Sequence, residues 1–219
     1  MDLLERIDTM IDERHVLGHP FYRAWVAGTL PTEALQEYAR QYYGFESTFP
    51  RFLSTLHARS ERAGDRQALL DNLWDEEHGD SNHAELWLRF AEGLGVSRND
   101  VLAAARNLHT KALVDTYWRV CREGPVAAGV AAVYAYERQV PQVAQAKIDG
   151  LRMRYGIEDD RTLAFFEIHA SLDVEHSEAE RRMLSTVSEE DEASVVEGAG
   201  AALDGWWGFL DAVTPNAAG

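Results

Sequence analysis

Three side chains that commonly bind metals lie at helical spacing in the segment HASLDVEH, residues 169–176. His169, Asp173 and His176 are separated by four and three residues, so on a helix they fall within roughly 60° of one another. Imidazole and carboxylate groups on one such stripe can hold a metal ion together. A charged, solvated helix face has the same pattern, so the interpretation depends on whether the chain supplies further ligands.

A second pair of potential ligands lies in DNLWDEEHGDSNHAELW, residues 71–87. Glu76 and His83 are seven residues apart, which on a continuous helix places them two turns apart on one face. Gly79 would lie between them on that face and leave room for an ion or a substrate. Most of the other polar side chains of the segment are expected to point elsewhere: Asp75, Glu77, His78 and Asp80.

Glu137 is a carboxylate in the otherwise apolar helical segment 126–148. An unpaired charge buried there would cost several kcal/mol, on the order of other buried polar groups, so Glu137 needs a partner. Pro141 lacks the backbone N–H that would bond the carbonyl of Glu137, and we expect the helix to distort at that point.

Together these segments contribute three carboxylates and three imidazoles. Oxygen and nitrogen ligands without a thiolate favour iron or manganese, and six ligands are better suited to two ions than to one. Zinc is also compatible, but it is more often held by four ligands. Each pair taken alone is also typical of a solvated helix face; their joint occurrence with Glu137 favours a metal site.

The composition narrows the class of protein. The 219 residues are 46% hydrophobic, which predicts one domain covering residues 1–219. A formal charge of −16 makes nucleic acid and anionic membranes unfavourable partners. The start MDLLERIDTM lacks the pattern of a signal peptide, no long apolar run is present, and Cys121 is the sole cysteine. We therefore expect a cytoplasmic protein without disulfides.

Helical periodicity dominates, and the predicted fold class is all-α. Pro50 is expected within or at a bend of one helix, and the tail after Thr214 is expected to be frayed. The predicted helices cover residues 2–16, 20–28, 31–49, 65–95, 97–123, 126–148, 158–187 and 188–213.

The ordered set Glu-x6-His, Glu, His-x3-Asp-x2-His resembles the ligand signature of the haem-oxygenase-like di-metal oxidases. The chain most resembles the branch that contains the chlamydial protein associating with death domains. The resemblance covers nearly the whole chain and is carried by residues 19–25, 37–59, 69–87, 127–141 and 169–176. It implies a seven-helix bundle shared with haem oxygenase, the pyrroloquinoline quinone synthase C protein and thiaminase II.

The resemblance also implies an activity and its residues. Such proteins make p-aminobenzoate for folate synthesis by cutting up one of their own tyrosines, with two metal ions (Fe/Fe or Fe/Mn), dioxygen and an external reductant of unknown identity. The implied metal ligands are Glu76, His83, Glu137, His169, Asp173 and His176. The sacrificed tyrosine falls on Tyr22, a second tyrosine on Tyr38, and the amine-donating lysine on Lys147. A further family tyrosine is Phe165 here, so a role for that hydroxyl is not expected. A homodimer is implied as well.

Three alternatives remain open on the sequence. A relative that oxidises an external small molecule would keep all six ligands and differ in its pocket. A thiaminase-like enzyme would use a cysteine, but Cys121 is far in sequence from the ligand motifs and is expected to be a buried structural thiol. A non-enzymatic helical interaction protein would give no reason for six potential ligands.

Overall fold

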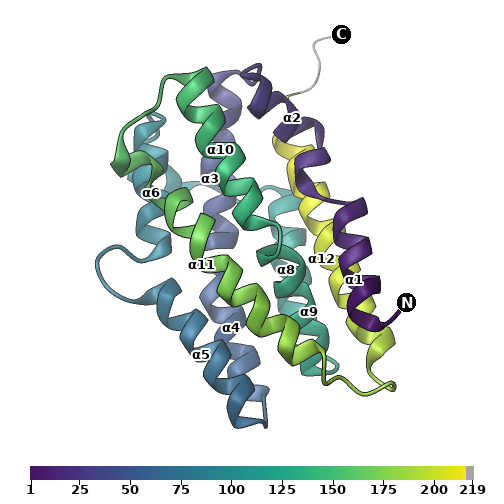
Figure 1. Ribbon diagram of the computed structural model, residues 1–219. Coiled ribbons are helices and arrows are strands. Elements are labelled where there is room, and N and C mark those ends of the chain that lie inside the picture. Colours follow the sequence, from purple (N-terminus) through teal and green to yellow (C-terminus); the bar gives the residue numbers. More distant parts are fainter. Residues whose placement is uncertain (216–219) are drawn as a thin grey trace.

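The computed structural model describes residues 1–215, and all the regular secondary structure of this part is helical (Figure 1). This confirms the predicted all-α class. Residues 216–219, which form most of the tail expected to be frayed, lie outside the described residues. The helices of the described part are α1 (Leu3–Glu13), η1 (Val16–Gly18, a 3-10 turn), α2 (Pro20–Ala27), α3 (Thr32–Glu46), α4 (Phe49–Arg59), α5 (Ala63–Glu77), α6 (His83–Gly93), α7 (Arg98–Ala103), α8 (Leu108–Arg122), α9 (Val126–Glu137), α10 (Val140–Tyr155), α11 (Asp160–Leu184) and α12 (Glu192–Val213).

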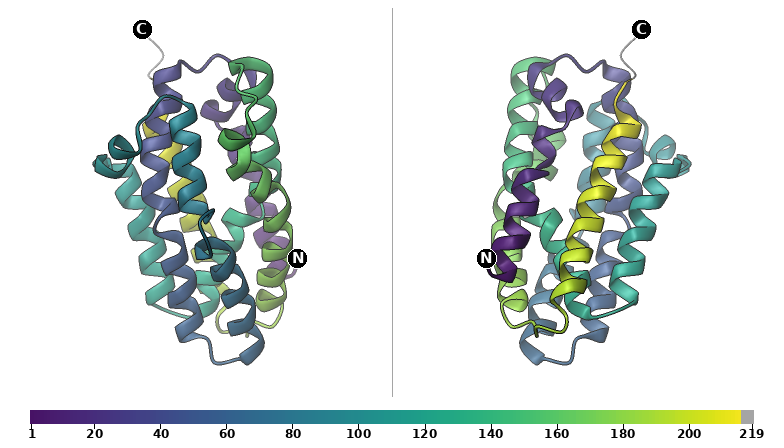
Figure 2. Two further views of the ribbon diagram at one scale, coloured as in Figure 1. Left: turned by 90° about the vertical axis from the view of Figure 1, so that its left-hand side faces the viewer. Right: turned by 90° about the vertical axis from the view of Figure 1, so that its right-hand side faces the viewer.

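The most apolar helix, α9, lies inside the bundle. Every residue from Ala128 to Glu137 is buried, as expected of a helix that is hydrophobic on all sides. It packs between α11 and α12, and Figure 2 shows the long helices running close to the long axis of the bundle. A side chain at Gly198 of α12 would collide with the backbone of Ala128, so glycine at this position permits the close approach of α12 to α9.

Two prolines divide helices that the periodicity predicted to be continuous. Helix α3 ends at Glu46, four residues before Pro50, and α9 ends at Glu137, four residues before Pro141. In each case the proline lacks the N–H that would bond the carbonyl four residues earlier, and its ring would clash with that carbonyl. The expected distortion at Glu137 is therefore confirmed, while the continuous helices 31–49 and 126–148 were wrong.

The predicted helix 65–95 is also broken. Helix α5 ends at Glu77 and α6 begins at His83, with Gly79 in the left-handed region (φ 79°) between them. Asn82 starts the new helix because its side chain accepts a hydrogen bond from the backbone N–H of Glu85. Gly79 is exposed, so the prediction that it leaves room for an ion beside Glu76 was wrong.

The predicted helix 97–123 is divided in the same way. Ser97 caps α7 as expected, but Asn107 caps a second helix, α8, which ends before the predicted break at Gly124. Such breaks explain why twelve α-helices are delimited in residues 1–215 where the resemblance implied seven.

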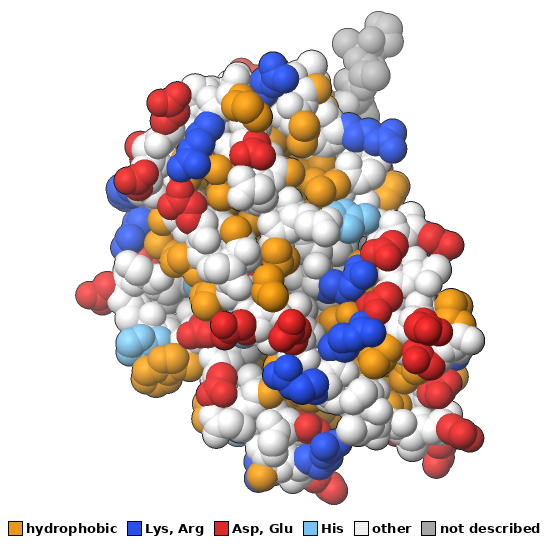
Figure 3. Space-filling model, in the orientation of Figure 1, with side chains coloured by type: hydrophobic (Ala, Val, Ile, Leu, Met, Phe, Trp, Pro, Cys, Tyr) orange, Lys and Arg blue, Asp and Glu red, His pale blue; other side chains and the backbone are white. Residues whose placement is uncertain are grey.

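The surface is charged, and acidic and basic side chains are interleaved with hydrophobic ones on the face drawn in Figure 3. Many of these charges form exposed ion pairs, such as Arg152 with Glu167 at 2.9 Å. Among the helices of residues 1–215, none combines the length and the apolar character needed to cross a bilayer.

Candidate metal centre

The six side chains predicted as ligands lie together in the interior of the bundle. They come from α5, α6, α9 and α11, and each belongs to a residue that is 8% exposed or less. Glu76 and His83 meet across the break between α5 and α6, where Glu76 Oε1 lies 2.9 Å from His83 Nδ1. The two residues are adjacent because the chain turns back at the loop 78–82, and not because they share a helix face.

Helix α11 supplies half of the set in the predicted manner. His169, Asp173 and His176 are all buried on one stripe of the helix. The ring of His169 lies 4.3 Å from that of His83, centroid to centroid, and His176 Nδ1 lies 3.8 Å from Asp173 Oδ1. Glu137 enters from the end of α9, where its Oε1 accepts a hydrogen bond from the side-chain amide of Asn72 at 2.9 Å.

Hydrogen bonds to their outer nitrogens determine which nitrogen two of the histidines turn inward. His169 Nδ1 lies 2.7 Å from the backbone carbonyl oxygen of Phe165, which can only accept a hydrogen bond. Nδ1 therefore carries the proton, and Nε2 is the nitrogen that can bind a metal. His176 has the opposite arrangement, because its Nε2 lies 3.1 Å from Asp75 Oδ2 and its Nδ1 faces Asp173. Partners of this kind fix the orientation of metal-binding imidazoles in proteins.

Three carboxylates at the centre were not predicted. Glu46, at the end of α3, offers an oxygen within 4.8 Å of donor nitrogens of His83 and His169. Glu180 lies one turn beyond His176 on α11, and both of its oxygens are buried. Asp75, expected to point elsewhere, contacts His176, whereas Glu77, His78 and Asp80 are exposed, as expected for most of that group.

The buried carboxyl groups are destabilised as anions. Burial, reinforced by neighbouring carboxylates, raises the pKa values of Glu46, Glu76 and Glu180 well above the ordinary range. Burial also raises the pKa of Asp173 to about 7. So much acidic charge in one dry location calls for a cation.

The unpaired polar atoms of the interior all belong to this centre. In the described residues, the buried side-chain oxygens and nitrogens without a hydrogen-bond partner are found on Glu46, Asn72, Glu76, Glu137, Asp173, His176 and Glu180. His83 Nδ1 also lacks a hydrogen bond, because its 2.9 Å contact with Glu76 Oε1 does not have hydrogen-bond geometry. Buried polar atoms without partners are rare in folded proteins and often mark a site for an ion or water. Their types, carboxylate oxygen and imidazole nitrogen, fit iron or manganese.

The other predicted site residues adjoin the centre on its apolar side. Tyr22, Lys147 and His169 line one narrow cavity of about 30 Å³, together with Tyr42, Phe165 and Phe166. The hydroxyls of Tyr22 and Tyr38 are 3.0 Å apart, and Lys147 Nζ donates a hydrogen bond to the Tyr38 hydroxyl at 2.8 Å. Tyr22, Tyr38 and Lys147 thus form one buried chain of contacts beside the histidines.

The protonation of this chain is shifted by burial. Burial lowers the pKa of Lys147 to about 7 and raises the pKa values of Tyr22 and Tyr38 above the ordinary range. A large share of the Lys147 amine is therefore unprotonated at neutral pH, while both phenols keep their protons. Phe165 lines the cavity with its ring 4.1 Å from that of His169, so an apolar ring stands where the resemblance implied a tyrosine.

Comparisons with known proteins identify the family. Residues 36–207 match the model of a family described as iron-containing redox enzymes. The 4-aminobenzoate synthase of Chlamydia muridarum is 40% identical over 211 residues, which cover 96% of this chain and 89% of that protein. The 4-aminobenzoate synthase of Nitrosomonas europaea is 39% identical over 223 residues, with coverages of 97% and 91%.

Solved structures show the same fold. A TenA homologue from Pseudomonas syringae superimposes with a TM-score of 0.81 at 16% identity, covering 96% of this chain and 90% of that one. A domain from Shewanella denitrificans with a heme oxygenase-like fold gives a TM-score of 0.80 at 18% identity, with coverages of 97% and 92%. The chain therefore belongs to the family of iron-containing redox enzymes and has a haem-oxygenase-like fold.

Proposed function

We propose that this protein is a di-metal oxidase that makes p-aminobenzoate from the side chain of its own Tyr22. The relatives from Chlamydia muridarum and Nitrosomonas europaea are named for this product, 4-aminobenzoate. A tyrosine side chain can provide all the carbon atoms of p-aminobenzoate, because its ring and Cβ correspond to the ring and the carboxyl carbon of the product. The conversion requires cleavage of the Cα–Cβ bond, oxidation of Cβ and replacement of the phenol oxygen by nitrogen.

The cavity beside Tyr22 is the observation that carries this proposal. Its volume of about 30 Å³ holds roughly two water-sized molecules, which is room for dioxygen. Pockets for external small molecules measure roughly 300 Å³ or more. Tyr22 already lies in the cavity wall, so on this side of the centre an internal tyrosine is favoured over the alternative of an external substrate.

The proposed metal ligands are the six predicted residues with Glu46 added. When bound, the two ions, Fe/Fe or Fe/Mn, supply the activation of dioxygen with electrons from an external reductant. The protein's own residues hold Tyr22 against the cavity and keep bulk water out. Lys147 presents an unprotonated amine to the tyrosine pair, as expected of the nitrogen donor.

The geometry does not support two of the alternatives, a cysteine-dependent enzyme and a non-enzymatic interaction protein. Cys121 is buried, does not line the cavity, and burial raises the pKa of its thiol to about 12, so it is not placed as a nucleophile. A purely structural interaction protein would have no use for the concentrated buried carboxylates. We place the reaction in the cytoplasm, in keeping with a single reduced thiol.

Isotope labelling tests the source of the product. Protein containing ring-¹³C tyrosine is loaded with Fe²⁺, alone or with Mn²⁺, and given a reductant and dioxygen in the presence of excess unlabelled tyrosine. We expect labelled p-aminobenzoate at no more than one molecule per chain, and loss of the p-hydroxybenzyl group from the peptide that contains Tyr22. Tyr22→Phe should abolish the product, whereas Tyr43→Phe, a half-buried tyrosine outside the cavity, should not. Unlabelled product would instead establish an external substrate.

A second label tests the amine donor. Protein containing ε-¹⁵N lysine should yield ¹⁵N-labelled p-aminobenzoate, and Lys147→Arg should abolish it because guanidinium stays protonated. Lys111→Arg is the matched control, since Lys111 is exposed and is the chain's other lysine. Full activity of the Lys147→Arg protein would remove Lys147 from the mechanism.

A further inference from the structure

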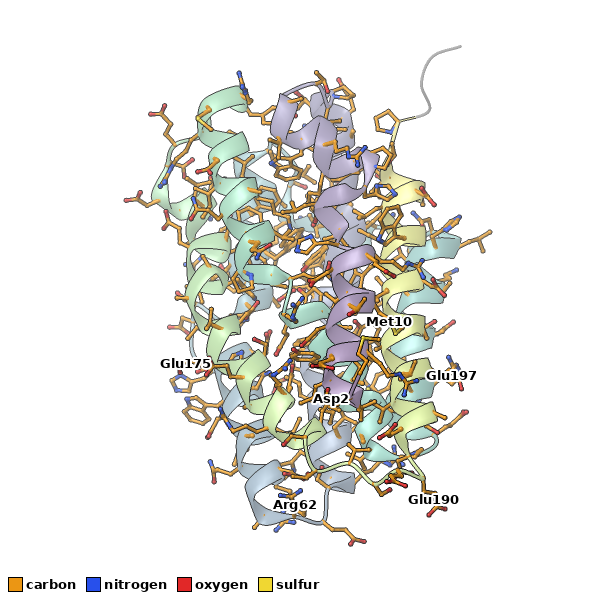
Figure 4. All side chains as sticks on the ribbon, turned by 45° about the vertical axis from the view of Figure 1, so that its right-hand side comes forward. Asp2, Met10, Arg62, Glu175, Glu190 and Glu197 are labelled. Atoms are coloured by element: carbon orange, nitrogen blue, oxygen red, sulfur yellow. The ribbon has the colours of Figure 1, made fainter. Side chains whose placement is uncertain are left out.

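One side of the buried centre faces a polar groove between α5 and α11. The groove has a volume of about 490 Å³, and both His176 and Asp75 line it. Figure 4 labels two of its other residues, Glu175 on α11 and Arg62 at the start of α5. Asp75 is partly exposed, with 38% of its side chain accessible, whereas the side chain of His176 is 9% accessible. The Asp75–His176 pair therefore connects the centre with solvent.

The two ends of the ligand stripe on α11 differ in their surroundings. His169, at one end, lines the narrow apolar cavity next to Tyr22. His176, two turns later, lines the polar groove. The outer partner of His169 is a backbone carbonyl that the helix itself provides, but the outer partner of His176 is a side chain from another helix.

We propose that Asp75 is a positioning residue for the metal centre, which holds His176 with Nδ1 turned toward the ion and stabilises the ion from the solvent side. This inference rests on the proposed metal centre and assigns a role to a residue outside its ligand set.

The chemistry follows from the contact. A carboxylate can only accept a hydrogen bond, so Nε2 of His176 carries a proton and Nδ1 is the nitrogen that is left to bind a metal. Nδ1 is buried and has no hydrogen-bond partner. When a cation binds at Nδ1, the Nε2–H becomes more acidic, and the adjacent carboxylate stabilises the added positive charge.

Metal affinity separates this role from a general effect of groove charge. Asp71 lines the same groove on the same helix, but its carboxylate accepts from Gln67 at 2.7 Å and has no contact with His176. Asp75→Ala and Asp71→Ala therefore remove the same charge from the same groove. To measure affinity, metal-free protein is titrated anaerobically with Mn²⁺ while free Mn²⁺ is followed by electron paramagnetic resonance. To measure the rate of Mn²⁺ release, a chelator is added to the loaded protein and the loss of bound Mn²⁺ is timed.

We expect Asp75→Ala to weaken Mn²⁺ binding by about 10-fold or more and to speed its release, as is usual for loss of a carboxylate behind a ligating histidine. Asp71→Ala should stay within about 2-fold of the wild type. Asp75→Asn, which keeps an acceptor oxygen but no charge, should recover part of the loss. Equal behaviour of the two alanine variants, whether both weakened or both unchanged, would overturn the proposal.

A second readout does not depend on metal. In metal-free protein burial opposes protonation of His176, but the neighbouring carboxylates Asp173, Glu137 and Asp75 outweigh this effect and raise the pKa of His176 to about 9. In the ¹⁵N spectrum of its ring recorded above that pH, we therefore expect the neutral Nε2–H tautomer in the wild type and a mixture in the variant Asp75→Ala. An unchanged tautomer would contradict the positioning role. If the wild type itself bound no Mn²⁺ or Fe²⁺, the proposed metal centre would fail, a result distinct from wild-type binding with no effect of Asp75.

Discussion

Lys147 shows how the interior controls a single functional group. Its side-chain nitrogen lies 5.0 to 5.9 Å from the ring centroids of five aromatic side chains, and it donates a hydrogen bond to the Tyr38 hydroxyl. Cation–π contacts favour the charged amine only modestly, and burial outweighs them, so the pKa is lowered to about 7 from 10.5.

This shift predicts a pH-dependent stability. Between pH 7 and 10.5 the unfolded chain holds a proton on Lys147 that the folded protein has lost, so the contribution of Lys147 to the free energy of unfolding rises with pH in this window. Lys147→Met lacks this rise, and its stability relative to wild type should fall by roughly 4 kcal/mol from pH 7 to the upper end of the window. Urea unfolding of both proteins at several pH values checks the prediction. Parallel curves would mean that the amine is not depressed in pKa.

Glu46 gives a second prediction at the scale of one residue. Because its carboxylate lies within reach of His83 and His169, Glu46→Gln should weaken binding of one of two metal ions by about 10-fold or more while leaving the other ion bound. Glu33→Gln, an exposed glutamate on the same helix, is the control. The metal-to-protein ratio after anaerobic Fe²⁺ loading decides the matter; a ratio unaffected by Glu46→Gln would exclude this carboxylate as a ligand.

The residues at the centre differ in how readily a sequence reveals them. His169, Asp173 and His176 share a helix face, so periodicity was enough to group them. Asp75 could not be found in this way, because its contact with His176 depends on how α5 packs on α11. Glu46 had a signal that was not used: ESTFP, residues 46–50, repeats the spacing of ERQVP, residues 137–141, with a glutamate four residues before a proline.

At the scale of elements, the two proline breaks place glutamates at the ends of helices. Glu46 and Glu137 are the last residues of α3 and α9, and the chain resumes a helix within a few residues. At such a helix end the backbone leaves the helical conformation, and the carboxylate of the last residue is buried in the interior. The centre therefore depends on interruptions of helices as well as on the one continuous helix, α11.

The break at Pro141 can be removed to test this view. In Pro141→Ala the missing N–H returns, and we expect α9 to extend past Glu137 and displace its carboxylate. Mn²⁺ affinity should fall by about 10-fold or more, while the unfolding free energy of the metal-free protein changes by no more than about 1 kcal/mol. Pro125→Ala, at the other end of α9, is the control. Unchanged affinity in Pro141→Ala would show that the break is not needed.

At the scale of the whole molecule, the metal-free fold contains a concentration of buried carboxyl groups whose anionic forms a bound cation would stabilise. At a free Mn²⁺ or Fe²⁺ concentration 100 times the dissociation constant, binding should stabilise the fold by about 2.7 kcal/mol per ion. For a chain of this length each kcal/mol corresponds to roughly 2–4 °C in Tm. Anaerobic thermal unfolding should show this increase for wild type and a clear loss for His169→Ala. No increase in wild type would argue against the centre.

The overall class was readable from the sequence, but the path of the chain was less so. Periodicity identifies helical faces without reporting where a helix stops, so the breaks after Glu46, Glu77 and Glu137 were missed or underestimated. Glu76 and His83 were correctly predicted to lie together, but the predicted shared helix face was wrong, because they meet across the break between α5 and α6. The expected homodimer stays a prediction, which light scattering on the purified protein can check.

The helix ends at Glu46, Glu77 and Glu137 have an electrostatic consequence that does not involve side chains. The carboxyl end of an α-helix carries roughly half a negative elementary charge from aligned peptide dipoles, and α3, α5 and α9 all finish at or next to residues of the centre. Peptide dipoles do not titrate. Acidification that protonates the carboxylates therefore leaves this contribution unchanged, and the helix ends continue to offset part of the positive charge that the histidines of the centre gain at low pH.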